Sequence, residues 1–182
     1  MDTSQPDTKQ DRPHEQPLDR SAHGEDAYGT VAGDVDDRTV HFTRHYAAPI
    51  ERVWAALTEP ERLARWLTDS TVVPGPGGRI AHDFGDGGIC AGDVLTWQPP
   101  HVLEYEWCFP QEGRTVLRFE LAADPDGGTR LALDHRELPE GPARGYAAGW
   151  HAHLEAFAAE LGERSRVDWD ARFTELLPHY RR

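Results

Sequence analysis

The feature that most constrains this sequence is one long helix, predicted over residues 141–161. Its large apolar side chains recur at spacings of four, four, three and four residues, so they lie along one side of an α-helix. They are Tyr146, Trp150, Leu154, Phe157 and Leu161. Gly141-Pro142 provides a start and Gly162 a stop. A stripe this large has to be buried, so we expect the preceding strands to cover it.

Those strands are predicted from alternating apolar and polar residues. In 39–46, for example, Val40 and Phe42 share one face. Short turns rich in glycine, proline and aspartate separate the segments, which favours antiparallel pairing. The predicted strands are 39–46, 79–84, 89–97, 103–109, 115–123 and 129–135, with a further strand end at 72–73. We therefore expect a curved antiparallel sheet of about six or seven strands around the long helix, an α+β fold.

Two short helices are predicted after the first strand. Residues 50–57 carry apolar side chains at 50, 53, 54 and 57, the spacing of an amphipathic helix. Thr58, followed by Pro60 and by Glu61 three residues on, is typical of the start of a second helix that runs to Trp66.

The two ends of the chain differ from the middle. Residues 1–37 have almost no large apolar side chains and hold ten acidic residues against Lys9, Arg12 and Arg20, so we predict a disordered acidic leader. The domain itself is predicted over 38–162. Residues 163–182 form a tail in which apolar residues from Trp169 to Leu177 recur at the spacing of a short amphipathic helix.

Composition excludes several classes of function. A net charge of −13 argues against binding to nucleic acid, because such binding needs lysine and arginine to neutralise phosphates. No apolar run approaches the roughly 20 residues of a membrane span, and no signal peptide is evident, so we expect a cytoplasmic protein without membrane insertion. Cys90 and Cys108 lack metal-site spacing, and we find no cofactor-binding motif, so neither a metal nor a cofactor is expected.

One stretch carries a family resemblance. Residues 48–66, APIERVWAALTEPERLARW, together with Gly149-Trp150 on the long helix, resemble the activator of heat shock protein 90 ATPase homologue-like branch of the START-like (SRPBCC) superfamily. The resemblance covers about 38–162. It implies a helix-grip fold, in which the sheet holds the last helix, the two short helices close one end, and a cavity lies between sheet and helix. Members of the superfamily bind apolar small molecules, and some are cyclases, dehydratases or hydrolases.

A cavity of this kind would be lined by inward residues of the sheet and by the near side of the helix. Aromatic rings with one polar edge suit a mostly apolar ligand held by a few hydrogen bonds. The alternation and the helical spacing nominate nine ligand-binding residues: Phe84, Trp97, Tyr105, Trp107, Phe119, Leu133, Tyr146, Trp150 and His153.

Three residues are candidates for catalysis, although ordinary structural roles are the alternative. His135 ends an inward-facing alternation and His153 follows Trp150 by three residues, so either could act as a general acid or base, with Tyr105 as a further candidate. His151 and His153 cannot share a metal ion, because residues two apart on a helix point in nearly opposite directions.

The leading hypothesis from the sequence is a non-catalytic module, monomeric or homodimeric, that binds an apolar or aromatic small molecule. One alternative is an enzyme of the polyketide cyclase/dehydratase or hydrolase kind. Another is a co-chaperone-like regulator of a heat shock protein 90 type ATPase.

Overall fold

The computed structural model describes residues 28–125 and 127–181, which form one eight-stranded antiparallel sheet and four α-helices. The strand order is β1-β2-β8-β7-β6-β5-β4-β3, so only β2 and β8 are paired without being neighbours in sequence. The strands are β1 (Thr30–Asp34), β2 (Asp37–Tyr46), β3 (Asp69–Val73), β4 (Arg79–Asp83), β5 (Ile89–Gln98), β6 (Val102–Phe109), β7 (Gly113–Ala123) and β8 (Thr129–Leu138). A short 3-10 helix, η2 (Gly85–Gly87), joins β4 to β5.

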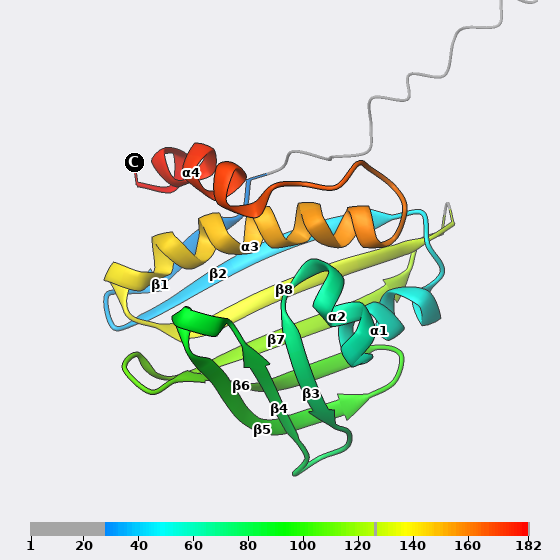
Figure 1. Ribbon diagram of the computed structural model, residues 1–182, viewed down its shortest axis with the longest axis horizontal. Coiled ribbons are helices and arrows are strands. Elements are labelled where there is room, and N and C mark those ends of the chain that lie inside the picture. Colours follow the sequence, from blue (N-terminus) through cyan, green and yellow to red (C-terminus); the bar gives the residue numbers. More distant parts are fainter. Residues whose placement is uncertain (1–27, 126, 182) are drawn as a thin grey trace, which may run out of the picture.

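The sheet curves around the long helix α3 (Glu140–Glu160), and this confirms the predicted helix-grip fold (Figure 1). The two predicted short helices are α1 (Ile50–Thr58) and α2 (Pro60–Trp66), which close one end of the sheet. The last helix, α4 (Trp169–Tyr180), packs on α3. Within the residues described, no helix is both long and apolar enough to cross a bilayer.

The strand β1 corrects the predicted extent of the acidic leader. It lies inside residues 1–37 and pairs with β2, with Val31 opposite Val40. Composition missed this strand because it buries little, Val31 alone being partly covered, and its stability comes from the ladder to β2. Residues 1–27 of the predicted leader lie outside the described part of the chain. With β1 the sheet has eight strands, one more than the upper prediction.

The core lies between the concave face of the sheet and α3. The predicted stripe of α3 is buried at Trp150, Leu154 and Phe157, and Ala143 and Ala147 are fully buried beside it. Near the closed end, the Phe157 ring meets that of Trp66 edge-on with centroids 4.8 Å apart. Burying apolar side chains of this size contributes about 1.5–3 kcal/mol each, which fixes α3 on the sheet.

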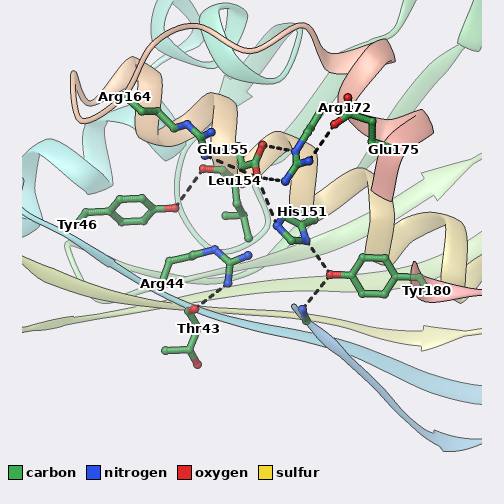
Figure 2. A network of polar contacts seen from close by, with 11 residues as sticks. Thr43, Arg44, Tyr46, His151, Leu154, Glu155, Arg164, Arg172, Glu175 and Tyr180 are labelled. Atoms are coloured by element: carbon green, nitrogen blue, oxygen red, sulfur yellow. Dashed lines mark hydrogen bonds and ion pairs between the residues drawn. The ribbon is translucent and has the colours of Figure 1, made fainter. Parts of the chain in front are cut away.

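A buried polar network holds α4 and the start of β1 on the outer side of α3 (Figure 2). The Glu155 carboxylate, only 2% exposed, accepts two hydrogen bonds of 2.8 Å from the Arg172 guanidinium. One turn earlier on α3, His151 Nδ1 lies 2.9 Å from the Tyr180 hydroxyl, which also accepts a hydrogen bond from Gly29 N. Two side chains of α4 and the backbone before β1 are thus tied to a single face of α3.

Candidate functional site

A pocket of about 360 Å³ opens between one end of the sheet, the first half of α3 and the start of α4. The sheet contributes residues at the end of β4, on β6 and in the turn that follows β6. Most of the lining side chains are apolar, and seven of them carry aromatic rings other than histidine. The lining residues are Phe84, Trp107, Phe109, Glu112, Pro142, Gly145, Tyr146, Gly149, Trp150, His153, Trp169 and Phe173.

Five of the nine residues nominated as ligand-binding line this pocket: Phe84, Trp107, Tyr146, Trp150 and His153. The other four do not. Trp97 packs edge-on against Trp54, with ring centroids 5.4 Å apart. Tyr105, Phe119 and Leu133 are buried in the packed part of the core. Alternation identifies the inward face of a strand, but it cannot tell which part of that face borders empty space.

Sequence reasoning missed the other seven lining residues. Gly145 and Gly149 lie four residues apart on the side of α3 that carries Tyr146 and Trp150. Small residues in a large apolar stripe leave space beside it, and this was a signal that could have been used. Phe109 continues the alternating apolar face of Tyr105 and Trp107, so the pattern placed it inward although it was not nominated. Glu112 and Pro142 carried no comparable signal. Trp169 and Phe173 were recognised as helical, but their pattern does not say what they pack against.

Aromatic rings form the walls of the pocket. On the sheet side, the Trp107 ring contacts those of Trp150 and Phe84, with centroids 5.2 and 5.9 Å apart. On the α4 side, Trp169 and Phe173 stack almost in parallel, 5.0 Å apart with an interplanar angle of 10°. Flat walls of this kind favour an aromatic ligand, since rings pair well in stacked and edge-to-face arrangements.

Two hydrogen-bond donors of the lining residues are unsatisfied. The indole nitrogens of Trp107 and Trp169 are both buried, and neither has a hydrogen-bond partner in the described part of the chain. Trp107 Nε1 lies close enough to the Tyr146 hydroxyl to affect its pKa, but makes no hydrogen bond to it. A buried donor without an acceptor costs about 1–3 kcal/mol, so both groups can gain from an acceptor on a ligand.

Tyr146 and Glu112 link α3 to the turn after β6 at the exposed side of the pocket. The Tyr146 hydroxyl donates a hydrogen bond to the exposed Glu112 carboxylate. Burial and this contact raise the pKa of Tyr146, so its hydroxyl stays protonated and remains a donor.

His153 is the one histidine among the lining residues, and its ring lies near those of three tryptophans, Trp66, Trp150 and Trp169. Its Nδ1 donates to the Trp66 carbonyl over 3.2 Å, and its ring tilts over Trp169 at 5.1 Å. Burial lowers the pKa of His153 to about 4, so the ring is neutral at pH 7. Because Nδ1 carries the proton, Nε2 is an acceptor, and no side chain or backbone group of the described residues binds it.

His135 and Tyr105, the other catalytic candidates, do not line the pocket. His135 is fully buried; its Nδ1 accepts from Trp150 Nε1 over 3.0 Å, and its Nε2 donates to Thr115 Oγ1 over 2.8 Å. Burial lowers the pKa of His135 to about 3, which keeps it neutral. Tyr105 donates its hydroxyl hydrogen to His82 Nε2 over 3.0 Å, and burial raises its pKa. Both are satisfied by protein partners.

The pocket shows no arrangement for metal binding. Among residues 28–125 and 127–181, no three or more His, Cys, Asp or Glu side chains are grouped in a way that could hold a metal ion. The polar groups that the pocket offers a ligand are two indole N–H groups, one imidazole nitrogen and the Tyr146–Glu112 pair.

A curved sheet that grips the long helix α3 and leaves a pocket beside it defines a START-like, helix-grip domain. Within that class, the chain belongs to the family described as Activator of Hsp90 ATPase homolog 1-like protein, whose model matches residues 47–162. The matched range ends before α4 and begins after β1 and β2. No curated protein matched the chain.

Solved structures show the same fold. The crystal structure of CalU16 from Micromonospora echinospora is 22% identical with a TM-score of 0.70, and covers 84% of this chain and 94% of its own. Protein MLL2253 from Mesorhizobium loti is 28% identical with a TM-score of 0.64, covering 71% of this chain and 100% of its own. DynU16, described as a protein in the dynemicin biosynthetic locus, is 27% identical with a TM-score of 0.64, covering 75% of this chain and 51% of its own.

Proposed function

We propose that the protein binds an apolar, aromatic small molecule in the pocket between the sheet and α3, without changing it chemically. The observation that carries this proposal is a pocket of about 360 Å³ that is lined by seven aromatic side chains besides His153 and by few polar atoms. Ligand pockets commonly measure about 300–1,000 Å³ and combine apolar walls with a few placed polar groups.

The state of the titratable groups supports binding without catalysis. A general acid or base works best when its pKa lies near the operating pH. Burial keeps the pKa of His153 at about 4 and that of His135 at about 3, so neither can donate a proton at pH 7. Tyr146 holds its proton and donates it to Glu112 in a hydrogen bond. These groups can orient a ligand, but they are poorly poised for proton transfer.

Filling the pocket tests the proposal. A Cβ added at Gly145 would meet no atom within 4 Å, so α3 can carry a side chain at this lining position, and Gly145→Leu should reduce the space in the pocket. We expect the neutral fluorophore N-phenyl-1-naphthylamine to bind the wild type and to bind this variant about tenfold more weakly or worse, a loss of at least about 1.4 kcal/mol. Fluorescence titration measures both dissociation constants.

Stability separates this effect from misfolding. Replacing a helical glycine by leucine gains roughly 0.5–1 kcal/mol in helix propensity, so the variant should melt no lower than the wild type. Ala171→Leu is the matched control, because it adds leucine at an exposed position of α4 that does not line the pocket. The proposal is wrong if Gly145→Leu folds normally and binds the fluorophore as tightly as Ala171→Leu does.

An enzymatic function is the second candidate, and one observation favours it. His153 Nε2 is an acceptor without a protein partner in the described residues, on a side chain that lines the pocket. DynU16, a solved structure similar to this chain, is described as belonging to a biosynthetic locus. Mass spectrometry of the molecule that co-purifies with wild type and with His153→Gln decides between the two: equal masses support binding alone, and a different, precursor mass indicates catalysis.

A further inference from the structure

We infer that α4 is part of the binding site and that Trp169 contacts the ligand, its indole N–H donating a hydrogen bond to an acceptor on an aromatic ring system. This inference rests on the proposed function and adds a residue and a ligand class to it. Trp169 and Phe173 lie outside residues 47–162, the part that matches the family model, so this wall of the pocket is contributed by the tail of this chain.

The position of Trp169 supports this role. Its ring stacks on Phe173 at 5.0 Å and lies 5.1 Å from the His153 ring, so it extends the aromatic wall from α3 to α4. It also lines a second hollow of about 470 Å³, between α2, the last turns of α3 and the segment before α4. The indole therefore lies between the two hollows and borders both of them.

The chemistry of the indole identifies the kind of ligand. Trp169 Nε1 is buried and has no acceptor in the described part of the chain, and the same is true of Trp107 Nε1 on the opposite wall. A planar aromatic molecule that carries a carbonyl or similar acceptor would satisfy a donor while its ring stacks on the walls.

The indole is held in place before any ligand arrives. Trp169 is the first residue of α4, and the preceding Asp168 caps that helix by accepting from Ala171 N over 3.0 Å. Three residues after Trp169, Arg172 is fixed by its two hydrogen bonds to the buried Glu155. A donor positioned in this way loses little freedom on binding, which favours specificity for the acceptor.

A matched pair of probes tests the inference. 9-Fluorenone and fluorene have the same tricyclic shape, but only fluorenone carries a carbonyl acceptor. Equilibrium dialysis should show that the wild type prefers fluorenone by about fivefold to tenfold, the size of one net hydrogen bond. In Trp169→Phe, which keeps an aromatic ring but removes the N–H, this preference should fall to about twofold or less, with fluorene binding much less affected.

Control variants show which tryptophan supplies the hydrogen-bond donor. Trp54→Phe makes the same change at a partly exposed tryptophan that packs on Trp97 away from the pocket, and it should leave the preference intact. If Trp169→Phe keeps the preference and Trp107→Phe loses it, the donor is on β6 and our assignment to α4 is overturned while the pocket stands. If both probes bind without any preference, the acceptor class is overturned. If neither binds the wild type or displaces N-phenyl-1-naphthylamine, the proposed function fails together with this inference.

Discussion

Replacing Arg172 by methionine is expected to lower the free energy of unfolding by about 3 kcal/mol. Removing one partner of a buried ion pair typically costs about 3–5 kcal/mol, because the other charge is left in an apolar environment. Here the remaining charge would be Glu155, which is 2% exposed. We place the effect at the lower end because Arg164 stays 3.6 Å from the same carboxylate. Urea unfolding followed by tryptophan fluorescence measures the change.

The pKa of Glu155 shows how strongly its surroundings favour the charged form. Burial alone would raise this pKa, but the contacts with His151 and Arg172 and the charges of Arg164 and Arg172 outweigh burial and lower it to about 2. His151 Nε2 lies 3.5 Å from Glu155 Oε1, without hydrogen-bond geometry, so Arg172 provides the principal hydrogen bonds. Methionine keeps the apolar stem of Arg172 and removes only its charge and donors.

A double variant distinguishes loss of the pair from loss of packing. Glu155→Met with Arg172→Met removes both charges, so it should be clearly more stable than Arg172→Met alone, as buried pairs replaced by apolar residues often are. Equal losses in the single and double variants would contradict our account of the network. Arg172→Met should also weaken aromatic probe binding, since Trp169 and Phe173 are held on the same helix.

The sequence predicted the fold well where periodicity alone determines structure. The spacing of Trp150, Leu154 and Phe157 defines one face of a helix whatever the rest of the chain does, and α3 begins and ends within one residue of its prediction. The strand β1 was missed for the opposite reason. Its residues bury almost nothing, so no hydrophobic pattern marks them, and only the ladder to β2 makes them a strand.

The candidate site was harder to predict, because a pocket is space that the side chains of neighbouring elements leave unfilled. Tyr105 and Trp107 are two residues apart on the same face of β6, yet only Trp107 lines the pocket. The Tyr105 hydroxyl is hydrogen-bonded to His82 instead. Likewise, the pattern around His135 places it inward, but its partners Thr115 and Trp150 come from β7 and α3. Such contacts join strands and helices that are far apart in the sequence, and the pattern within one segment does not say which other segments lie beside it.

The protein is expected to lose stability as the pH falls from 6.5, because three of its histidines resist taking up a proton while the chain is folded. His82 and His135 are buried, and burial lowers the pKa of each to about 3, while burial lowers that of His153 to about 4. In the unfolded chain a histidine takes up a proton near pH 6.5. The unfolded state therefore binds more protons between pH 6.5 and 3, and the free energy of unfolding decreases as the pH falls.

The size of this loss can be tested in a narrow pH window. Each of the three histidines should contribute about 1 kcal/mol between pH 6.5 and 5.5, because half of the unfolded chains already carry its proton at pH 6.5, so the total is about 3 kcal/mol. Glu155 contributes little in this window, because a carboxyl whose folded-state pKa is lowered to about 2 loses its stabilising effect only as the pH falls below the ordinary glutamate pKa of about 4.3. Urea unfolding at pH 7.5, 6.5 and 5.5 measures the slope. His135→Gln, which keeps a donor and an acceptor, should reduce the slope by about a third, whereas the exposed His179→Gln should leave it unchanged. Equal slopes in all three proteins would show that His135 is protonated in the folded state.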